Sequence, residues 1–213
     1  RVPATTALAT GAVGVYVLIG MGLGLWGGLK PRGVGDKLGV VMAAGGVSVP
    51  SFWFGLALLY VFAYRFPILP LGGYGSPMHV ILPALTLGMG GAAYYIRLLR
   101  QSMQDVMRQD FIRTARAKGL PESQVIRRHA LRNASLPIVT LLGVDVAHLL
   151  GGAVLTESVF GWPGIGSQAM QAIATMDVPV IMGTVLFAAT VIVAVNLIVD
   201  CVTLWLDPRV SSL

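Results

Sequence analysis

The sequence predicts an all-α fold, a polytopic transmembrane helical bundle with five spans. Of the 213 residues, 55% are hydrophobic and only 11% are charged, and the mean hydropathy is +0.78. Soluble domains carry about 25% charged residues, so this chain lacks the polar surface that a soluble fold needs. Several apolar stretches also reach the roughly 20 residues that a helix needs to cross a bilayer. These observations exclude a soluble globular protein and indicate a membrane protein.

Five apolar stretches are the candidate spans. The first has no charged residue, the second contains Pro50, and the third begins near Pro83 and becomes polar after Tyr95. The fourth starts at a Leu-Pro pair, and the fifth contains a single acidic residue. In chain order the spans are predicted at about 6–29, 38–66, 80–99, 136–155 and 180–206.

Positive charge alternates between the connecting loops. Lys and Arg number three in 30–37, none in 66–79, nine in 97–132 and none in 157–178, and the C-terminal tail holds Arg209. Loops rich in Lys and Arg face the cytoplasm. The pattern therefore places the N-terminus and the two uncharged loops outside and the C-terminus in the cytoplasm. This topology also explains the net charge of +6, so we do not expect nucleic-acid binding.

The start of the chain and its cysteine content add two expectations. Arg1 stands where a complete protein has Met, and the apolar stretch that follows has no signal-peptide cleavage site. We therefore expect the sequence to begin inside a longer protein. The single Cys201 lies in an apolar stretch, so neither a disulfide framework nor a metal cluster is expected.

The two predicted outer loops differ in character. The first, at 67–74, is rich in Pro and Gly and is expected to be irregular. The second contains WPGIG at 162–166, followed by an amphipathic stretch at 167–175. We expect this stretch to form a short helix at the outer membrane surface.

The long loop between the third and fourth spans has a helical pattern followed by a break. Between 101 and 116 one helical stripe is apolar, formed by Met103, Val106, Met107 and Phe111. Gly119 and Pro121 end this helix, and a second helix is predicted at 122–131. One interpretation is an amphipathic hairpin on the inner membrane surface without a partner. The other is a docking element, in which Gly119 allows a left-handed turn or close backbone approach.

Motifs in this loop resemble a known family. The run RTARAKGL at 113–120, with HALRNA at 129–134 and Leu-Pro at 136–137, resembles the cytoplasmic EAA signature of ATP-binding-cassette (ABC) importer permeases. Arg113 and Thr114 replace the Glu and Ala of the general signature, as is usual in its dipeptide/oligopeptide/nickel branch. Further segments resemble the same branch, at 151–160, 162–166, 196–200 and 206–209.

The resemblance implies a type I ABC importer permease fold. The whole chain, 1–213, would form one transmembrane permease domain that lacks the additional N-terminal span of related permeases. The loop at about 100–133 would be the coupling loop, whose short coupling helices dock on a cytoplasmic ATPase. The residues implied in ATPase coupling are Arg113, Thr114, Ala115, Lys118, Gly119 and Leu120.

The chemistry of ATP hydrolysis is expected to lie outside this chain. No phosphate-binding Gly-x-x-x-x-Gly-Lys-Ser/Thr motif occurs in the sequence. ATP and Mg would therefore belong to partner subunits. We expect no catalytic residue, metal site or cofactor in this chain, which is not an enzyme by itself.

The resemblance also implies partners and a cargo. The partners would be a second homologous permease, two cytoplasmic ABC ATPase subunits, an extracytoplasmic solute-binding protein and membrane lipid. The binding protein would face the outer loops, where Glu157, Trp162 and Asp177 are candidate contacts. The location would be the bacterial or archaeal cytoplasmic (inner) membrane. The expected cargo is di- or oligopeptides, with nickel or another small solute as the alternative within the family.

Polar residues inside the predicted spans are the remaining candidates. An ionisable group at mid-membrane costs roughly 2.5–3.5 kcal/mol for Asp. Asp145 and His148 are three residues apart, hence on one helical face. They line the translocation pathway or bind a cation in one interpretation, and Asp145 pairs with a neighbouring helix in the other. For Asn196 and Asp200 we favour a structural role, since polar groups commonly form helix–helix hydrogen bonds. Two residues do not make a metal site.

Two functions of other classes fit parts of the sequence. An ion-coupled secondary transporter would use Asp145 and His148 for proton coupling, but it leaves the glycine-cornered loop unexplained. An intramembrane hydrolase would need a nucleophile at membrane depth. Ser48 and Ser51 flank Pro50, but no nucleophile motif surrounds either serine.

Overall fold

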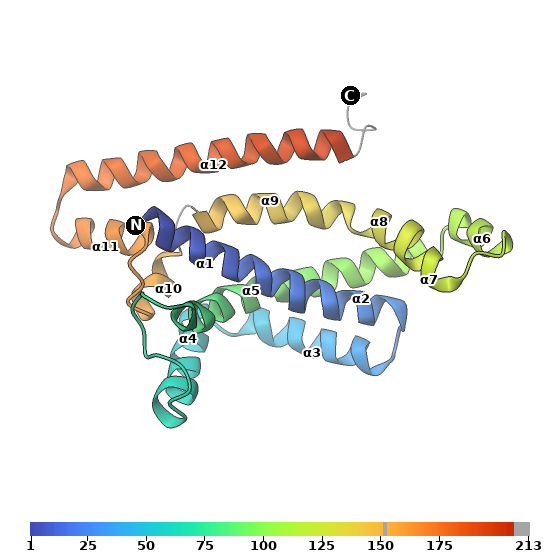
Figure 1. Cartoon of the computed structure of the whole chain (residues 1–213), viewed down its shortest axis with the longest axis horizontal. Helices are drawn as coiled ribbons and strands as arrows, with labels where there is room; N and C mark the ends of the chain where they lie inside the picture. Colours follow the sequence, from blue (N-terminus) through green and yellow to red (C-terminus); the bar gives the residue numbers. More distant parts are fainter. Residues whose placement is uncertain (151–152, 207–213) are drawn as a thin grey trace.

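The computed structural model describes residues 1–150 and 153–206, and these contain helices and loops but no β-strand. Most helices lie roughly along one long axis (Figure 1). Segments marked η are wider, π-helical turns that continue a neighbouring α-helix. In chain order the elements are α1 (Val2–Val15), η1 (Tyr16–Met21), α2 (Gly22–Leu29), α3 (Val34–Ser48), α4 (Ser51–Leu59), η2 (Tyr60–Arg65), α5 (Pro77–Met107), α6 (Asp110–Ala117), α7 (Glu122–Gln124), η3 (Val125–Ala130), α8 (Leu131–Ala134), α9 (Leu136–Leu150), α10 (Val154–Val159), α11 (Ile165–Ala174) and α12 (Val178–Leu206).

Three uninterrupted helical stretches are long and apolar enough to cross a membrane: Val2–Leu29, Pro77–Met107 and Val178–Cys201. Two bent pairs of helices meet the same criterion when each pair is counted as one span. The second of these pairs joins Glu122–Ala134 to Leu136–Leu150 at 48°. Counted in this way, the helices match the five predicted spans.

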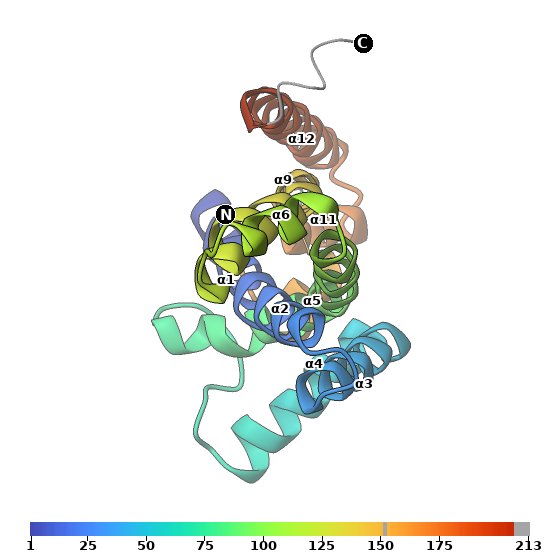
Figure 2. The ribbon, with the colours of Figure 1, turned by 90° about the vertical axis from the view of Figure 1, so that its right-hand side faces the viewer.

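The second predicted span is not one continuous helix. α3 and the α4–η2 segment meet at an angle of 103°, and Figure 2 shows α4 and the chain after it leaving the bundle. Pro50 causes the break, because its ring disfavours a helical conformation in the preceding residue. Val49 is accordingly extended, with φ −96° and ψ 124°. The prediction of one span over 38–66 was wrong in this respect.

The third and fourth spans also end at positions other than those predicted. α5 continues to Met107, so no separate helix begins at residue 101, and the chain breaks at Arg108–Gln109. This break shifts the apolar stripe, so that Ile112 is fully buried while the predicted Phe111 is 40% exposed. α9 ends at Leu150, and residues 151–152 lie outside the described part of the chain.

A ladder of glycines packs the first span tightly against α5. The three glycines recur every fourth residue, and a Cβ built on them would lie only 2.8, 2.9 and 2.6 Å from a side-chain Cβ of α5. In lipid, such small residues let helix backbones approach closely and gain van der Waals contact. The facing pairs are Gly20 with Tyr95, Gly24 with Leu99 and Gly28 with Met103.

The two loops rich in positive charge lie at the same end of the molecule. The α2–α3 turn and α6–α7 lie toward the right in Figure 1, whereas α10, α11 and the N-terminus lie toward the left. Close to the α2–α3 turn, Arg100 of α5 forms an ion pair with Asp36 in the first turn of α3. The backbone N–H of Arg32 also donates to Asp36 Oδ2 (2.7 Å). The arrangement agrees with the alternation of loop charge.

The glycine ladder generates a stability prediction. Gly24→Ala in the full-length protein is expected to lower the free energy of unfolding by about 1–3 kcal/mol, because the new methyl group overpacks the contact with Leu99. Gly22→Ala is the matched control, because a Cβ at Gly22 meets no atom within 4 Å. Thermal unfolding of both purified variants in detergent checks this. Equal midpoint temperatures of unfolding for the two variants would contradict the claim that the glycine ladder stabilises the packing of the first span on α5.

Candidate functional site

The loop after α5 turns a corner at Gly119. This residue has φ +77°, a left-handed conformation that glycine adopts without steric cost. The Gly119 N–H donates to the Arg116 carbonyl (2.9 Å), and the Leu120 N–H donates to the Ala115 carbonyl (3.4 Å). These bonds close the C-terminus of α6 as a glycine cap. The left-handed turn predicted at Gly119 is confirmed.

The corner is open to solvent. Gly119 is exposed, and a Cβ added to it would meet no atom of this chain within 4 Å. The backbone conformation, and not crowding inside the chain, is therefore what requires a glycine here. Arg116 donates two hydrogen bonds to Glu122 across the corner, at 3.0 and 2.6 Å. The guanidinium of Arg116 holds the pKa of the Glu122 carboxyl below its usual range.

Buried apolar residues fix both loop helices to the bundle. Ile112 and Ala115 of α6 and Val125 and Ala130 of η3 belong to one core cluster. That cluster also contains Leu99 and Met103 of α5, the residues that face the glycine ladder. The corner is therefore mounted firmly on α5.

The six residues implied in ATPase coupling divide into two groups. Arg113, Thr114, Lys118 and Gly119 are exposed. Ala115 is buried, and Leu120 is partly buried against the same core cluster. Four of the six can therefore meet a partner directly, whereas the other two hold the loop in place.

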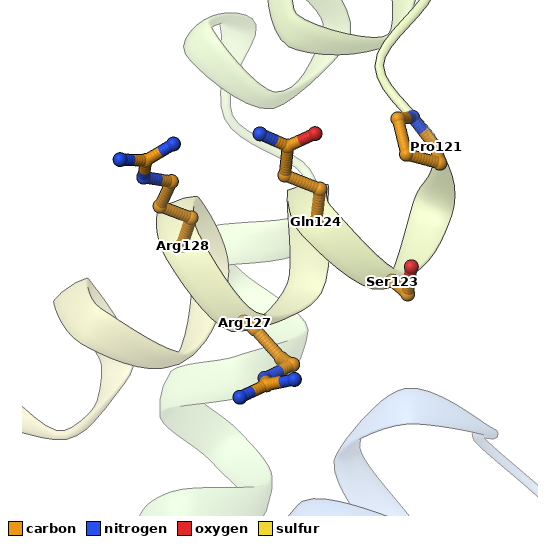
Figure 3. A pocket seen from close by; sticks show the side chains of 5 residues that line it. All are labelled: Pro121, Ser123, Gln124, Arg127 and Arg128. Atoms are coloured by element: carbon orange, nitrogen blue, oxygen red, sulfur yellow. The ribbon is translucent and has the colours of Figure 1, made fainter.

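A polar hollow of about 530 Å³ adjoins the corner. It is lined by Pro121, Ser123, Gln124, Arg127 and Arg128. Figure 3 shows Gln124 and Arg128 projecting to one side of the helix and Arg127 projecting to the other. Both arginines are exposed. Sequence reasoning did not single out these residues, and the available signal was the pair of adjacent arginines in the second loop helix.

The structure does not bring Asp145 and His148 together in one network. The half-buried Asp145 accepts a hydrogen bond from the Tyr95 hydroxyl of α5 (2.5 Å). Tyr95 in turn stacks on Tyr16 of η1, with ring centroids 5.2 Å apart. His148 is exposed. Asp145 therefore pairs with a neighbouring helix, as one of the two interpretations expected. A role in the translocation pathway stays a prediction.

The polar residues of α12 differ from each other. Asp200 is exposed. Asn196 Oδ1 is buried and has no hydrogen-bond partner among the described residues. Among the described residues, Asn196 Oδ1 therefore does not form the helix–helix hydrogen bond that was expected for this side chain. The resemblance segments at 151–152 and 207–209 lie outside the described residues.

At the opposite end, Glu157 and Trp162 lie inside the protein. Glu157 is fully buried and Trp162 almost so, whereas the expectation placed them on a docking surface. Glu157 accepts hydrogen bonds from the Thr5 hydroxyl (3.2 Å) and from the Ser167 N–H (2.7 Å) in the first turn of α11. The Trp162 indole donates to the Ala4 carbonyl (2.9 Å). The two side chains therefore tie the outer loop to α1 and are not exposed to solvent, and a contact of this loop with a binding protein stays a prediction.

Two further features describe this outer corner. A Cβ on Gly164 would lie 2.0 Å from Glu157 Oε1, so the glycine of the WPGIG motif makes room for the buried carboxylate. Asp177, the third candidate of the outer loop, is exposed. Its Oδ1 accepts a hydrogen bond from the Val180 N–H at the start of α12 (3.3 Å).

Curated relatives resemble the chain over nearly its whole length. It is 39% identical to a glutathione transport system permease protein of Pectobacterium atrosepticum, over 91% of the chain and 63% of the relative. It is 38% identical to a putative peptide permease protein of Brucella ovis, over 99% and 69%. It is 36% identical to a dipeptide transport system permease protein of Escherichia coli, over 99% and 71%. The chain thus spans about two thirds of the length of these relatives, and less than that of the first.

A solved structure has the same fold. An inward-facing form of the MetNI methionine ABC transporter matches with a TM-score of 0.76 at 14% identity, over 97% of this chain and 94% of that chain. This confirms the all-α fold of an ABC importer permease. The sequence model described as "Binding-protein-dependent transport system inner membrane component" matches residues 20–212. The chain therefore belongs to the family of binding-protein-dependent transport system inner membrane components.

Proposed function

We propose that this chain is the permease subunit of an ABC importer that moves di- or oligopeptides across the cytoplasmic membrane. The single observation that carries the proposal is the exposed Gly119 corner, mounted on α5 and open to a partner. The ATPase subunits dock on this corner, and they alone hydrolyse ATP. The C-terminus lies in the cytoplasm with the corner.

α5 is the element that carries motion between the two sides of the membrane. Its 31 residues form a rod about 46 Å long. Its C-terminal end holds the loop helices, and its C-terminal half, from Tyr95 to Met103, packs against the glycine ladder of the first span. A displacement of the corner therefore reaches α5 through the core cluster that Ile112 and Val125 share with Leu99.

The names of the relatives favour peptides as the cargo over nickel. They describe permeases for glutathione, peptides and dipeptides. A second homologous permease completes the pathway, and an extracytoplasmic binding protein delivers the substrate to the end that carries α11. The ion-coupled rival receives less support, because Asp145 bonds to Tyr95 and not to His148.

Uptake by the full-length permease with its partner subunits, reconstituted in vesicles, tests the function. A labelled dipeptide is expected to accumulate only with ATP and binding protein, and nickel is the competing cargo. Accumulation that follows a proton gradient without the ATPase would contradict the proposal and favour the ion-coupled rival.

Gly119→Asp is expected to abolish both ATPase association and peptide uptake. The side chain places bulk and charge on the docking corner, in a left-handed backbone conformation that glycine adopts most readily. The variant still inserts, because Gly119 contributes no packing. Co-purification of the ATPase from membranes checks this.

The matched control is Gly75→Asp. Gly75 is also exposed, with φ +151° and no atom near a built Cβ, but it lies in the predicted outer loop. This variant is expected to retain the ATPase. If the Gly119→Asp variant also retained the ATPase, the Gly119 corner would not be part of the ATPase docking site.

Asp145→Asn separates a charge in the pathway from a structural hydrogen bond. The amide oxygen still accepts from the Tyr95 hydroxyl, so only the charge is lost. If Asp145 lines the pathway, as we propose, uptake falls several-fold while ATPase association is unchanged. An unchanged rate of uptake would leave Asp145 with its structural role alone.

A further inference from the structure

We propose that one exposed face of α5 lines the translocation pathway, and that Arg97 on this face receives the C-terminal carboxylate of the transported peptide. The proposal rests on the proposed function and adds the chemical group by which the permease holds its substrate. A guanidinium presents its N–H donors in a planar fork that matches a carboxylate.

The exposed side of α5 is polar through the part that crosses the membrane. Between residues 82 and 104, four residues of α5 are exposed, and none of them is Val, Leu, Ile, Met or Phe. Their spacing of four, three and four residues places them on one side of the helix. This polar face consists of Gly90, Tyr94, Arg97 and Gln101.

The exposed side of α12 has the opposite character. Its large exposed side chains are apolar, which is typical of a helix side that faces lipid; they include Val185, Leu186, Val193, Leu197 and Ile198. The polar face of α5 has no such side chains. Contact with lipid would instead place a guanidinium and an amide in hydrocarbon, which is costly. The polar face is therefore suited to water.

The side chain of Arg97 points away from the α2–α3 turn and into the membrane. Its guanidinium donates to the Ala43 carbonyl of α3 (3.1 Å), whereas Arg100, one turn further along α5, pairs with Asp36. α3 runs outward from the α2–α3 turn, and Ala43 lies seven residues, about 10 Å, beyond Asp36. An arginine near the end of a lipid-facing helix reaches back toward water. Arg97 does the opposite, so its charge is held within the span.

The charge of Arg97 has no counter-ion within the part of the chain that the structure describes. The ion pairs there join Asp36, Asp110 and Glu122 to other arginines. The bond to Ala43 uses one of the five N–H donors of the guanidinium, and the neutral carbonyl leaves the positive charge uncompensated. An unpaired charge at membrane depth requires water or an anionic ligand. Arg97 is therefore available to a carboxylate that passes along the polar face.

An apolar pocket adjoins the outer part of the polar face. It has a volume of about 400 Å³ and lies in the angle between α3 and α4, beside α5. Gly90 belongs both to the pocket lining and to the polar face, and Trp53 and Phe54 add aromatic walls. Gly90 and Arg97 are about 10 Å apart along the helix, and an extended peptide advances about 3.5 Å per residue. A short peptide with its carboxylate on Arg97 therefore reaches the pocket with an apolar side chain.

Cysteine accessibility tests whether the polar face meets water. In the full-length permease without native cysteines, assembled with its partner subunits in lipid nanodiscs, Tyr94→Cys is expected to react with a water-soluble maleimide. Leu197→Cys is the matched control, because Leu197 is similarly exposed on α12 (64%, against 53% for Tyr94). The control is expected to react about tenfold more slowly, since lipid excludes water. Equally slow labelling of both would overturn the proposal and assign the polar face to lipid or to the second permease.

Protection of Tyr94→Cys from labelling tests the role of Arg97. The dipeptide Leu-Leu is expected to slow the labelling several-fold, and its C-terminal amide is not. This protection is expected to vanish when Arg97→Gln is added, which keeps a donor for the Ala43 carbonyl but removes the charge. It is expected to persist in part with Arg97→Lys. No binding protein is added, so the protection reports on the permease itself.

The possible outcomes separate this proposal from the proposed function. Equal protection by Leu-Leu and its amide, or no protection by either, would overturn the assignment of Arg97 to the carboxylate. Protection that persisted in full with Arg97→Gln would overturn it as well. In each case ATP-driven peptide uptake by the unaltered transporter would leave the proposed function standing. Absence of that uptake would overturn the proposed function, whatever the labelling showed.

Discussion

Close backbone packing between the first span and α5 is the constraint on which the rest of the structure depends. Lipid tails are as apolar as the helices, so association in a membrane relies on fit and not on exclusion of water. The glycines at 20, 24 and 28 supply this fit. The C-terminal half of α5 is thereby held against the first span, and α3, α4 and the loop helices pack around α5.

The same rod connects the two ends of the molecule. At one end it carries the cluster of Ile112, Val125 and Ala130 that fixes the loop helices. Near the other end Thr86 and Leu82 are buried beside the outer elements. The outer corner is stiff for a different reason, because the buried Glu157 bonds to both α1 and α11. Both ends of the molecule are therefore held by packing or buried hydrogen bonds.

Composition and local pattern predicted most of the fold, because a membrane span leaves a long apolar stretch and loop charge reports its orientation. The turn at Gly119 was predictable from local sequence, because Gly119 and Pro121, which both end helices, lie two residues apart. The bend at Pro50 was missed because proline occurs both in kinked helices and at true breaks. The burial of Glu157 and Trp162 was missed because it depends on contacts with Thr5 and Ala4, more than 150 residues away. Arg127 and Arg128 were not separable from other loop charges until the helix packing was known.

The central claim is that the Gly119 corner docks an ATPase subunit, and site-specific cross-linking tests it most directly. A cysteine at Lys118, which is exposed next to the corner, would be introduced after Cys201→Ser and given a short photoreactive group in native membranes. The account predicts a cross-linked product with a Walker-motif ATPase, absent when the cysteine is placed at the outer Gly75. Cross-linking of Lys118→Cys only to lipid or to another copy of this chain would contradict it.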